Sequence, residues 1–311
     1  MQRYTLSRLI QTIIVLVGVS LVLFLILYKM PGDPAKRMAG MKASPQVLEN
    51  VRQKWGLDKP LPVQYISYAG NIAKGNLGTS YRYNRPVSSI FAETFPATAK
   101  LAVFAIFIEI VLGLAAGILS ALKKRTFTDT FITISSTFLI CVPVFWLGML
   151  LQYIFGLKLG WLPVSGYEPT NLLYLILPGV TLAAISTGVL IRLIRASMLE
   201  VSGARYITMA RAKGLSESRV LIKHQLKNAL LPSVTFIGLE LGALMTGAVA
   251  TEIVFNYPGM GFAIYRAVME RDIPVVISGI LIMVFVYVMV NFFIDIIYGY
   301  LNPRVRLGLN A

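Results

Sequence analysis

The sequence predicts an all-α membrane protein with six transmembrane helices. Hydrophobic residues make up 56% of the 311 residues and charged residues only 14%, and the mean hydropathy is +0.71. A soluble domain carries about 25% charged residues. Several apolar runs reach roughly 20 residues, the length that a helix needs to cross a hydrocarbon core about 30 Å thick. Together these observations indicate a multi-pass protein in a lipid bilayer.

The six predicted spans lie at about 9–28, 97–121, 131–156, 172–191, 232–255 and 275–300. The first follows Arg3 and Arg8, as in a signal peptide, but its apolar run is longer and no small-residue cleavage site follows. We therefore expect a retained membrane helix at 1–29. The fourth span is the weakest, because Pro178 and Gly179 interrupt it, although membrane bundles tolerate such prolines.

The region 30–95 is predicted to form a small helical cap outside the membrane. Asp33-Pro34 and Ser44-Pro45 can each start a helix, because Asp and Ser cap helices well and proline suits the first turn. A helix from Ser44-Pro45 to Trp55 and a second helix at 61–73 are expected. A disordered loop is the alternative, and aromatic residues argue against it: Trp55, Tyr65, Tyr68 and Tyr81.

Positive charge sets the predicted orientation, because short loops rich in Lys and Arg stay in the cytoplasm. Basic residues gather before the first span, after the second and fourth spans, and in the tail at 302–311. The short loops on the opposite side hold only Lys158, Arg266 and Arg271. Both termini are therefore expected in the cytoplasm. The region 30–95 is also basic, but long loops cross the membrane largely regardless of charge.

The basic segment at 203–230 is predicted to form a helix, a glycine turn and a second helix on the cytoplasmic face. Gly214 breaks the helical pattern, because only glycine turns the backbone to φ > 0 cheaply. Apolar residues on both sides provide contact points: Ala210, Ala212, Leu215, Leu221, Leu226 and Leu230. Such an element is suited to docking on a soluble partner. The alternative is an amphipathic helix that rests on anionic membrane lipid.

The composition offers no sign of nucleic-acid binding or of an active site. The net charge of +15 would suggest nucleic acid in a soluble protein, but here the charges follow membrane topology. The lone Cys141 permits neither a disulfide nor a cysteine metal cluster, and His224 alone cannot form a metal site. No nucleophile–base arrangement and no G-x-x-x-x-G-K-[ST] phosphate loop is present. We expect no enzymatic activity and no cofactor in this chain.

Carboxylates inside the predicted spans are candidates for function. Glu109, Glu240 and Asp295 fall within spans, and Glu252 lies near an outer end. A charged carboxylate at the bilayer centre costs about 2.5–3.5 kcal/mol on insertion scales, so each is expected to face a cavity or a partner helix. For Asp295 and Glu252 a structural role is favoured, with Glu252 anchoring the turn at 256–261. Gly113-x-x-x-Gly117 would let helices pack closely, and an interface with another subunit is one possible use.

A series of motifs runs along the chain in a fixed order. They are Pro-Gly-Asp-Pro at 31–34, Gly-Leu-Asp-Lys-Pro at 56–60, Gly-Asn-Leu-Gly-Thr-Ser at 75–80, Ala-Arg-Ala-Lys-Gly-Leu at 210–215, Leu-Leu-Pro at 230–232, Thr-Glu-Ile-Val-Phe-Asn-Tyr-Pro-Gly-Met-Gly at 251–261 and Asn-Pro-Arg-Val-Arg at 302–306. In this order and spacing the chain resembles, nearly end to end, the permease subunits of dipeptide- and oligopeptide-type ABC importers. Asn76 and Asn302 stand where that family usually has Asp, and His224 and Lys227 also depart from the wider importer pattern.

The resemblance implies a type I ABC importer-like permease core at 96–301 that works only with partners. It implies a second homologous permease subunit, two cytoplasmic ATPase subunits that bind ATP and Mg²⁺, and an extracytoplasmic solute-binding protein. The implied cargo is dipeptides or oligopeptides, carried into the cytoplasm across a prokaryotic inner membrane.

The resemblance also implies roles for individual residues. The segment 203–230 is the implied coupling element. In it Gly214 permits the turn, Ala210 and Ala212 allow close approach, and direct ATPase contact is expected at Leu215, Ser216 and Glu217. Independently of the resemblance, which does not lead us to expect Glu240, the carboxylates inside the spans are candidates for lining the translocation path: Glu109, Glu240 and Asp295. A carboxylate there can attract the amino-terminal cation of a peptide. The outer turn is expected to use Glu252, Pro258, Gly259 and Gly261.

Three alternatives stay open. The same machinery would suit nickel complexes, glutathione or another small solute, since selectivity resides largely in the binding protein. A proton-coupled secondary transporter would use the span carboxylates as a relay and act alone, but the docking-type element counts against it. A receptor or scaffold would leave the carboxylates inside the spans unexplained.

Overall fold

The computed structural model describes residues 2–29, 44–55 and 58–301. The predicted helix start at Asp33-Pro34 and the motifs at 31–34 and 302–306 lie outside this part of the chain. Two compact units are present, one made of residues 1–94 with 263–292 and the other of residues 95–262 with 293–311. Each unit is described by itself.

The first unit contains three helices of its own and parts of three that continue into the second unit. They are α1 (Gln2–Lys29), α3 (Pro45–Trp55) and α4 (Leu61–Ala73), with parts of α5 (Val87–Leu122), α14 (Met260–Met269) and α15 (Ile273–Leu301). Helices α3 and α4 confirm the two helices that the sequence predicts in this region.

Aromatic residues of α4 pack against α1. The hydroxyls of Ser20 and Tyr65 share a hydrogen bond of 2.9 Å. The ring of Phe24 lies 5.5 Å from that of Tyr65 and 5.6 Å from that of Tyr68, measured between centroids. Buried aromatic contacts of this kind give α4 a fixed place on α1, which a disordered loop would not have.

A buried aspartate ties the loop after α4 to the turn between α14 and α15. Asp272 is 1% exposed and accepts hydrogen bonds from Ser80 Oγ at 2.5 Å, from Tyr81 N at 3.1 Å and from Arg82 N at 3.3 Å. Its partners lie about two hundred positions earlier in the chain, at separations of 190 to 192. This contact, which was not predicted from the sequence, fixes the end of the 75–80 motif.

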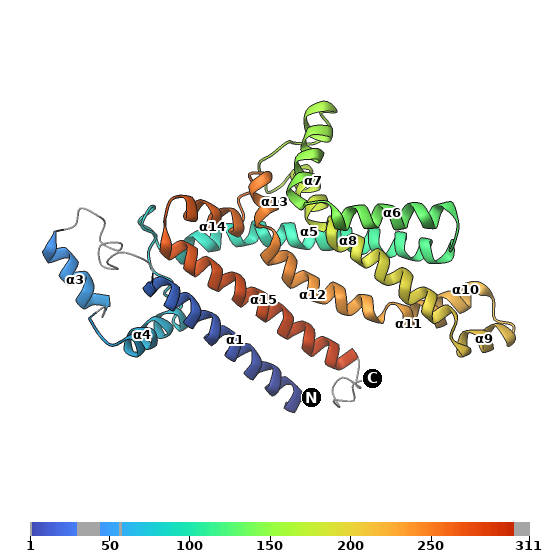
Figure 1. The fold of residues 1–311 in the computed structure, drawn as a ribbon, viewed down its shortest axis with the longest axis horizontal. Helices are drawn as coiled ribbons and strands as arrows, with labels where there is room; N and C mark the ends of the chain where they lie inside the picture. The colour runs from blue at the N-terminus through green and yellow to red at the C-terminus, as the bar shows by residue number, and fades with distance from the viewer. Residues whose placement is uncertain (1, 30–43, 56–57, 302–311) are drawn as a thin grey trace. The chain divides into compact units, whose positions relative to one another are not determined.

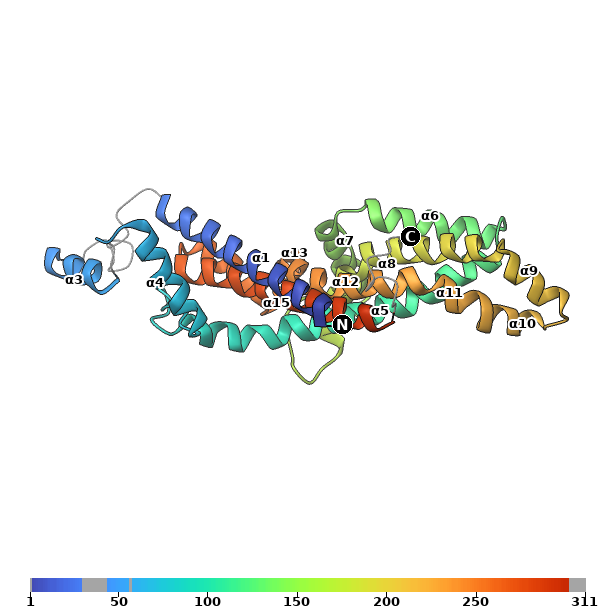
Figure 2. The same cartoon turned by 90° about the horizontal axis from the view of Figure 1, so that it is seen from below.

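The second unit is built around one long helix, α8 (Leu173–Ser202). The other elements are α6 (Phe127–Cys141), α7 (Val144–Leu151), η1 (Gln152–Lys158), α9 (Arg205–Ala212), α10 (Glu217–Arg219), η2 (Val220–Leu226), α11 (Lys227–Ala229), α12 (Leu231–Gly247) and α13 (Val249–Val254). Helix α8 contacts α6, α7, α12 and α13, and both views show α6 and α12 running along it (Figures 1 and 2).

The span that looked weakest in the sequence is the most buried of the long apolar helices. In α8, 72% of the most apolar window is buried, against at most 33% in the other three long helices. Pro178 and Gly179 lie inside α8 and do not end it. A Cβ atom on Gly179 would overlap the ring of Phe104, so the glycine lets α5 approach. Helix α8 also continues to Ser202, so Arg192 and Arg195 are helical rather than part of a loop.

Two predicted spans are broken rather than straight. The third turns by 109° between α6 and α7, at Val142-Pro143. Val142 has ψ 129°, as expected where the following proline disfavours the helical region. The fifth, predicted at 232–255, is divided into α12, which ends at Gly247, and α13, which begins at Val249. A bend of 47° lies just before this span, between α11 and α12.

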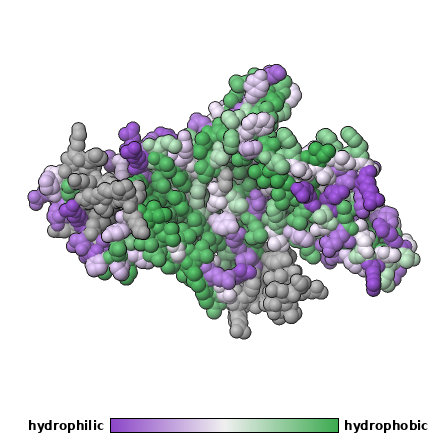
Figure 3. All heavy atoms as spheres, in the orientation of Figure 1, coloured by the Kyte–Doolittle hydropathy of each residue, from purple (hydrophilic) through white to green (hydrophobic). Residues whose placement is uncertain are grey.

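Among the described residues, four helices are long and apolar enough to cross a membrane, and the count reaches six if each bent pair is one span. The hydropathy view shows apolar residues along α1 in the first unit (Figure 3). Exposed apolar side chains of this extent suit contact with lipid.

The glycine pair of α5 serves packing within the chain. A Cβ atom on Gly113 would lie 2.5 Å from Leu190 Cδ2, and one on Gly117 would lie 2.8 Å from Ile194 Cβ. Both partners belong to α8. The pair thus lets α5 and α8 approach each other.

Gly188→Ala is expected to destabilise the protein, because the new Cβ atom would lie 2.6 Å from the backbone oxygen of Ser136 on α6. Alanine normally favours a helix over glycine by about 1 kcal/mol, so a loss has to come from this overlap. Thermal unfolding in detergent measures it, with a loss of about 1–3 kcal/mol expected. Gly203→Ala is the control, since its Cβ atom meets only the Glu200 oxygen at 3.6 Å. Equal stability of the two variants would contradict the close α6–α8 approach.

Candidate functional site

The segment after α8 folds back on itself as a hairpin of α9, a glycine turn, α10 and η2, here called the coupling hairpin (residues 205–226). Gly214 has φ +76°, the left-handed conformation predicted for it. Its amide donates to Arg211 O at 2.9 Å, and the amide of Leu215 donates to Ala210 O at 3.4 Å. The turn ends α9 and reverses the chain direction.

The coupling hairpin has its own small core and is fastened to α8. Ile207, Ala210 and Val220 form the buried core. Buried Gln225 donates from Nε2 to the backbone oxygen of Met198 on α8, at 3.0 Å. The hairpin is therefore joined to α8 at two places. The chain itself connects α8 to the start of α9, and the Gln225 side chain of η2 is hydrogen-bonded to α8. We expect hairpin and helix end to move together.

The six residues predicted to take part in ATPase coupling differ in their exposure. Ala210 is buried inside the hairpin, Leu215 is half-buried, and four of them are exposed: Ala212, Gly214, Ser216 and Glu217. Arg211 and Glu217 form an exposed two-bond ion pair across the turn, at 2.9 and 3.2 Å. Exposed pairs of this kind contribute little to stability, so Glu217 remains accessible to another protein.

Two large apolar side chains on the hairpin surface were not predicted from the sequence. Met209 is 61% exposed and Ile222 is 65% exposed. Hydrophilic residues gather around them over α9 and α10 (Figure 3). The exposure of Met209 could have been predicted from the helical period. When Ile207 and Ala210 face the hairpin core, Met209 lies on the opposite side of the helix. An exposed apolar side chain surrounded by charge is typical of a contact surface.

A buried ion pair joins three helices beside this hairpin. Asp129 on α6 is 4% exposed and accepts from Arg195 on α8, from Nε at 2.7 Å and from Nη2 at 2.9 Å. It also accepts from Ser120 Oγ on α5 at 2.6 Å and from the Arg125 amide at 2.9 Å. From the sequence, Arg195 was interpreted as a loop charge and Asp129 was not singled out. The pattern Thr126-x-x-Asp129, a helix-start motif, was the available signal.

The structure brings Glu109 and Glu240 together in the interior of the second unit. Glu109 on α5 is fully buried, and neither of its carboxylate oxygens has a hydrogen-bond partner among the described residues. Ser186 on α8 and Glu240 on α12 interact with it electrostatically, but the Ser186 hydroxyl donates to Ala183 O. Glu240 is half-buried. In this conformation the Glu240 side chain is partly accessible, and the Glu109 side chain is not.

Asp295, the third candidate for the path, lies half-buried on α15.

The outer-turn candidates surround one carboxylate. Glu252 on the short helix α13 is fully buried and accepts from Thr98 Oγ1 at 2.6 Å and from the Phe262 amide at 2.8 Å. Burial raises the pKa of the Glu252 carboxyl, and hydrogen bonds from Thr98, Phe262 and Gly261 oppose that rise. A Cβ atom on Gly259 would overlap this carboxylate. Residues 259–262 therefore wrap around Glu252 and attach it to α5.

The remaining outer-turn residues differ in position. Pro258 is exposed at the tip of the turn. Gly261 is buried, and a Cβ atom there would overlap Val249. This outer turn is a packing element around Glu252 with one exposed proline.

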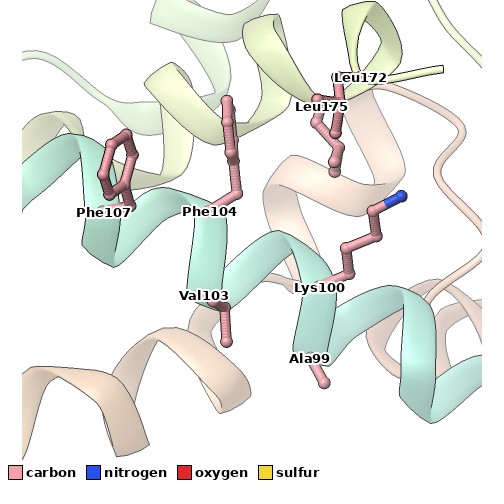
Figure 4. Close-up of a pocket in the computed structure, with 7 residues that line it drawn as sticks. All are labelled: Ala99, Lys100, Val103, Phe104, Phe107, Leu172 and Leu175. Carbon is pink, nitrogen blue, oxygen red and sulfur yellow. The ribbon is translucent and has the colours of Figure 1, made fainter. Parts of the chain in front are cut away.

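An apolar pocket of about 520 Å³ lies between α5 and the start of α8 (Figure 4). Its walls are formed by Ala99, Lys100, Val103, Phe104, Phe107, Leu172 and Leu175. Phe104 and Leu175 project toward each other across it (Figure 4). The one charged group, the Lys100 ammonium, already donates to Pro169 O at 2.6 Å. A peptide needs polar partners for its amides and termini, so these walls do not suit it.

Comparison with known proteins now identifies the family. Residues 113–307 match the family described as binding-protein-dependent transport system inner membrane component, and residues 1–102 match the family of the N-terminal part of such components. The chain belongs to this family. It is a multi-pass membrane protein of the permease type.

Several curated relatives align with nearly the whole chain. A dipeptide transport system permease protein of Alkalihalophilus pseudofirmus is 37% identical over 98% of this chain and 100% of its own length. A di/tripeptide transport system permease protein of Pseudomonas aeruginosa is 39% identical over 93% of this chain and 94% of its own. A glutathione transport system permease protein of Escherichia coli is 39% identical over 98% and 99%.

The fold has a solved counterpart. An inward-facing structure of the MetNI methionine ABC transporter matches with a TM-score of 0.58 and 17% identity, and the match covers 68% of this chain and 96% of that one. This confirms the predicted fold class, an all-α permease of the type I ABC importer kind.

Thr98→Val is expected to loosen the outer turn. The substitution keeps the shape but removes the donor to Glu252 and the acceptor of the Met260 amide, which lies 2.8 Å from Thr98 Oγ1. Leaving buried polar groups without partners costs about 1–3 kcal/mol. Thermal unfolding of purified protein gives the loss. Thr137→Val is the matched control, because Thr137 is exposed and donates only to Thr133 O of its own helix. Equal effects at both positions would show that the Thr98 contact carries no special weight.

Proposed function

We propose that this permease imports dipeptides or oligopeptides into the cytoplasm, as one of two homologous membrane subunits. Two ATPase subunits drive it, and an extracytoplasmic binding protein delivers the cargo. The observation that carries this proposal is the coupling hairpin, which is bound at two points to the most buried long helix of a chain related end to end to peptide permeases.

The hairpin has the features that docking on an ATPase needs. Its core and its bond to Met198 make it stiff enough to transmit a displacement. Met209 and Ile222 present apolar surface outward. Basic residues lie around them: Arg205, Arg211, Lys213, Arg219, Lys223 and Lys227. An anionic membrane surface would also attract these basic residues. However, two apolar side chains held in fixed positions by a folded hairpin suit a cleft in a protein better than a lipid surface.

The orientation of the chain in the membrane follows from the proposal that the coupling hairpin docks on the ATPases. The hairpin docks on ATPases in the cytoplasm, so the loop between α5 and α6 and both termini lie on that side. Region 30–95, with α3 and α4, then lies outside, where a binding protein reaches it. The core at 96–301 carries the path. Short loops with positive charge stay inside, which agrees with this placement.

Glutathione is the second candidate cargo. The Escherichia coli relative named as a glutathione permease is as similar in sequence as the peptide permeases are. Glutathione is itself a small peptide with a free amino group, so one carboxylate in the path serves both cargoes. Uptake of a labelled dipeptide in the presence of excess glutathione separates the two candidates. Inhibition by glutathione would support glutathione as a cargo, and unchanged dipeptide uptake would exclude it.

Gly214→Val is expected to lower uptake about tenfold while the chain still inserts. A β-branched residue at φ +76° is strained by about 1–3 kcal/mol, enough to lower the population of the docked hairpin about tenfold. Co-purification of the ATPase pair and uptake of a labelled dipeptide by the whole complex are the measurements. Gly214→Asn is the control, because asparagine adopts the left-handed region readily. Undiminished ATPase binding and uptake in the valine variant would rule out the docking role.

Glu240→Gln is expected to lower uptake of cationic dipeptides more than of anionic ones. Loss of one charge contact of about 1 kcal/mol corresponds to a change of about fivefold. Rates for Lys-Ala and Asp-Ala dipeptides in reconstituted vesicles give the ratio. Glu200→Gln is the control, since Glu200 is exposed near the cytoplasmic end of α8. An unchanged ratio in the Glu240 variant would remove this side chain from the path.

A further inference from the structure

We propose that the Asp129–Arg195 ion pair fastens α8 to the α5–α6 hairpin, so that a displacement of the coupling hairpin moves all three helices together. Asp129 and Arg195 are then positioning residues for coupled transport. This inference rests on the proposed function, because it concerns how movement that begins at the ATPases reaches the membrane spans.

The geometry makes one carboxylate a junction of three helices. Two donors hold Asp129 from the α5 side, Ser120 Oγ and the Arg125 amide. The third partner, Arg195, comes from α8 and uses two of its guanidinium nitrogens. The side chain of Asp129 is 6% exposed and that of Arg195 is 29% exposed. A two-bond contact between a guanidinium and a carboxylate fixes orientation as well as distance, and here little water competes for it.

Arg195 lies near the end of α8 to which the coupling hairpin is joined. A displacement of the hairpin would therefore reach the ion pair before the rest of α8. Arg195 lies one turn before Met198, which receives the hydrogen bond from Gln225 of the returning segment η2. The chain leaves α8 at Ser202 and starts α9 at Arg205. The covalent connection and this hydrogen bond between the coupling hairpin and α8 therefore lie at or beyond Met198, directly past the ion pair.

Apolar packing alone would not transmit such a movement in every direction. Between α8 and its neighbours, Gly113 meets Leu190 and Gly188 meets Ser136 in steric contact. Steric contact resists closer approach, but it resists separation and rotation only weakly. The ion pair resists both, since moving Arg195 away leaves Asp129 buried without its partner, which is costly. Without the pair, the end of α8 can turn while α5 and α6 stay in place.

A purely stabilising ion pair makes a different prediction. It would lower the amount of folded complex and leave each remaining complex fully coupled. The positioning role instead lowers the amount of solute moved for each ATP hydrolysed. Removing both members of a buried pair is often neutral for stability, so a double variant can separate the two roles.

The test uses the complete transporter, with companion permease, both ATPases and binding protein, in vesicles with a labelled dipeptide. The variants are Asp129→Asn, Arg195→Gln and the two combined. We expect each to cut dipeptide uptake per ATP hydrolysed about tenfold, within the usual range for coupling between sites. The combined variant should be no worse than either single one. ATPase co-purification should match that of the unchanged complex.

Matched controls remove the same charges nearby. Arg192→Gln takes an exposed guanidinium from α8, one turn before Arg195, and Glu200→Gln takes an exposed carboxylate from the same helix. Both should keep the ratio of the unchanged complex. An equal drop in the controls would overturn the proposal, as would a normal ratio in the Asp129 and Arg195 variants.

Failure of this inference can be told from failure of the proposed function. If the unchanged complex retains no ATPases or imports no dipeptide, the proposed function fails. If it imports dipeptide and the variants keep its ratio, only the ion-pair role fails. If a single variant does not insert, the combined variant decides, because it leaves no charge unpaired. Failure of the combined variant to insert would make the pair a folding element and would also overturn the proposal.

Discussion

The close approach of α8 to α5 and α6 is the interaction on which the rest of the second unit depends. Lipid tails are as apolar as leucine side chains, so helices in a bilayer associate through tight packing and polar contacts instead of the hydrophobic effect. Glycine supplies the tight packing at 113, 117, 179 and 188, where a methyl group would overlap the neighbouring helix. Once α8 is held this way, its end sets the place of the coupling hairpin.

Three buried carboxylates of this unit differ in their hydrogen bonding. Glu252 is fully hydrogen-bonded beside Thr98 at one end of α5, and Asp129 is fully hydrogen-bonded beside Ser120 at the other. Between these levels Glu109 lies buried with no hydrogen bond among the described residues. An unsatisfied carboxyl in a span is costly, and such cost is retained where the group works. The carboxylates at the two ends therefore hold neighbouring segments together, and under the proposed function the contacts that change during transport are assigned to the interior level around Glu109 and Glu240.

Capping residues, helical periodicity and glycine positions in the sequence were enough to predict much of the fold and the helix–turn–helix form of the coupling hairpin. Helices α3 and α4 follow from capping and period, and Gly214 adopts the positive φ that its place in the pattern requires. Contacts between residues far apart in the chain could not be predicted from such local patterns. Asp129 and Arg195 lie 66 positions apart, and Ser80 and Asp272 lie 192 apart, so neither residue shows its partner. The 109° turn at Val142-Pro143 depends on what α7 packs against, and composition does not contain that information.

Sequence similarity to permeases named for different cargoes limits where cargo choice can lie. The dipeptide relative at 37% identity and the glutathione relative at 39% both align over 98% of this chain, so the frame that holds α8 and the hairpin cannot by itself distinguish the two solutes. The carboxylates of Asp129 and Glu252 are buried and hydrogen-bonded within the chain, so a solute cannot reach them in this conformation. The carboxyl of Glu240 is only half-buried and is therefore partly accessible. Under the proposed function, discrimination between solutes within this chain is therefore assigned to the partly exposed groups on α12, and transmission of movement is assigned to the buried, hydrogen-bonded ones.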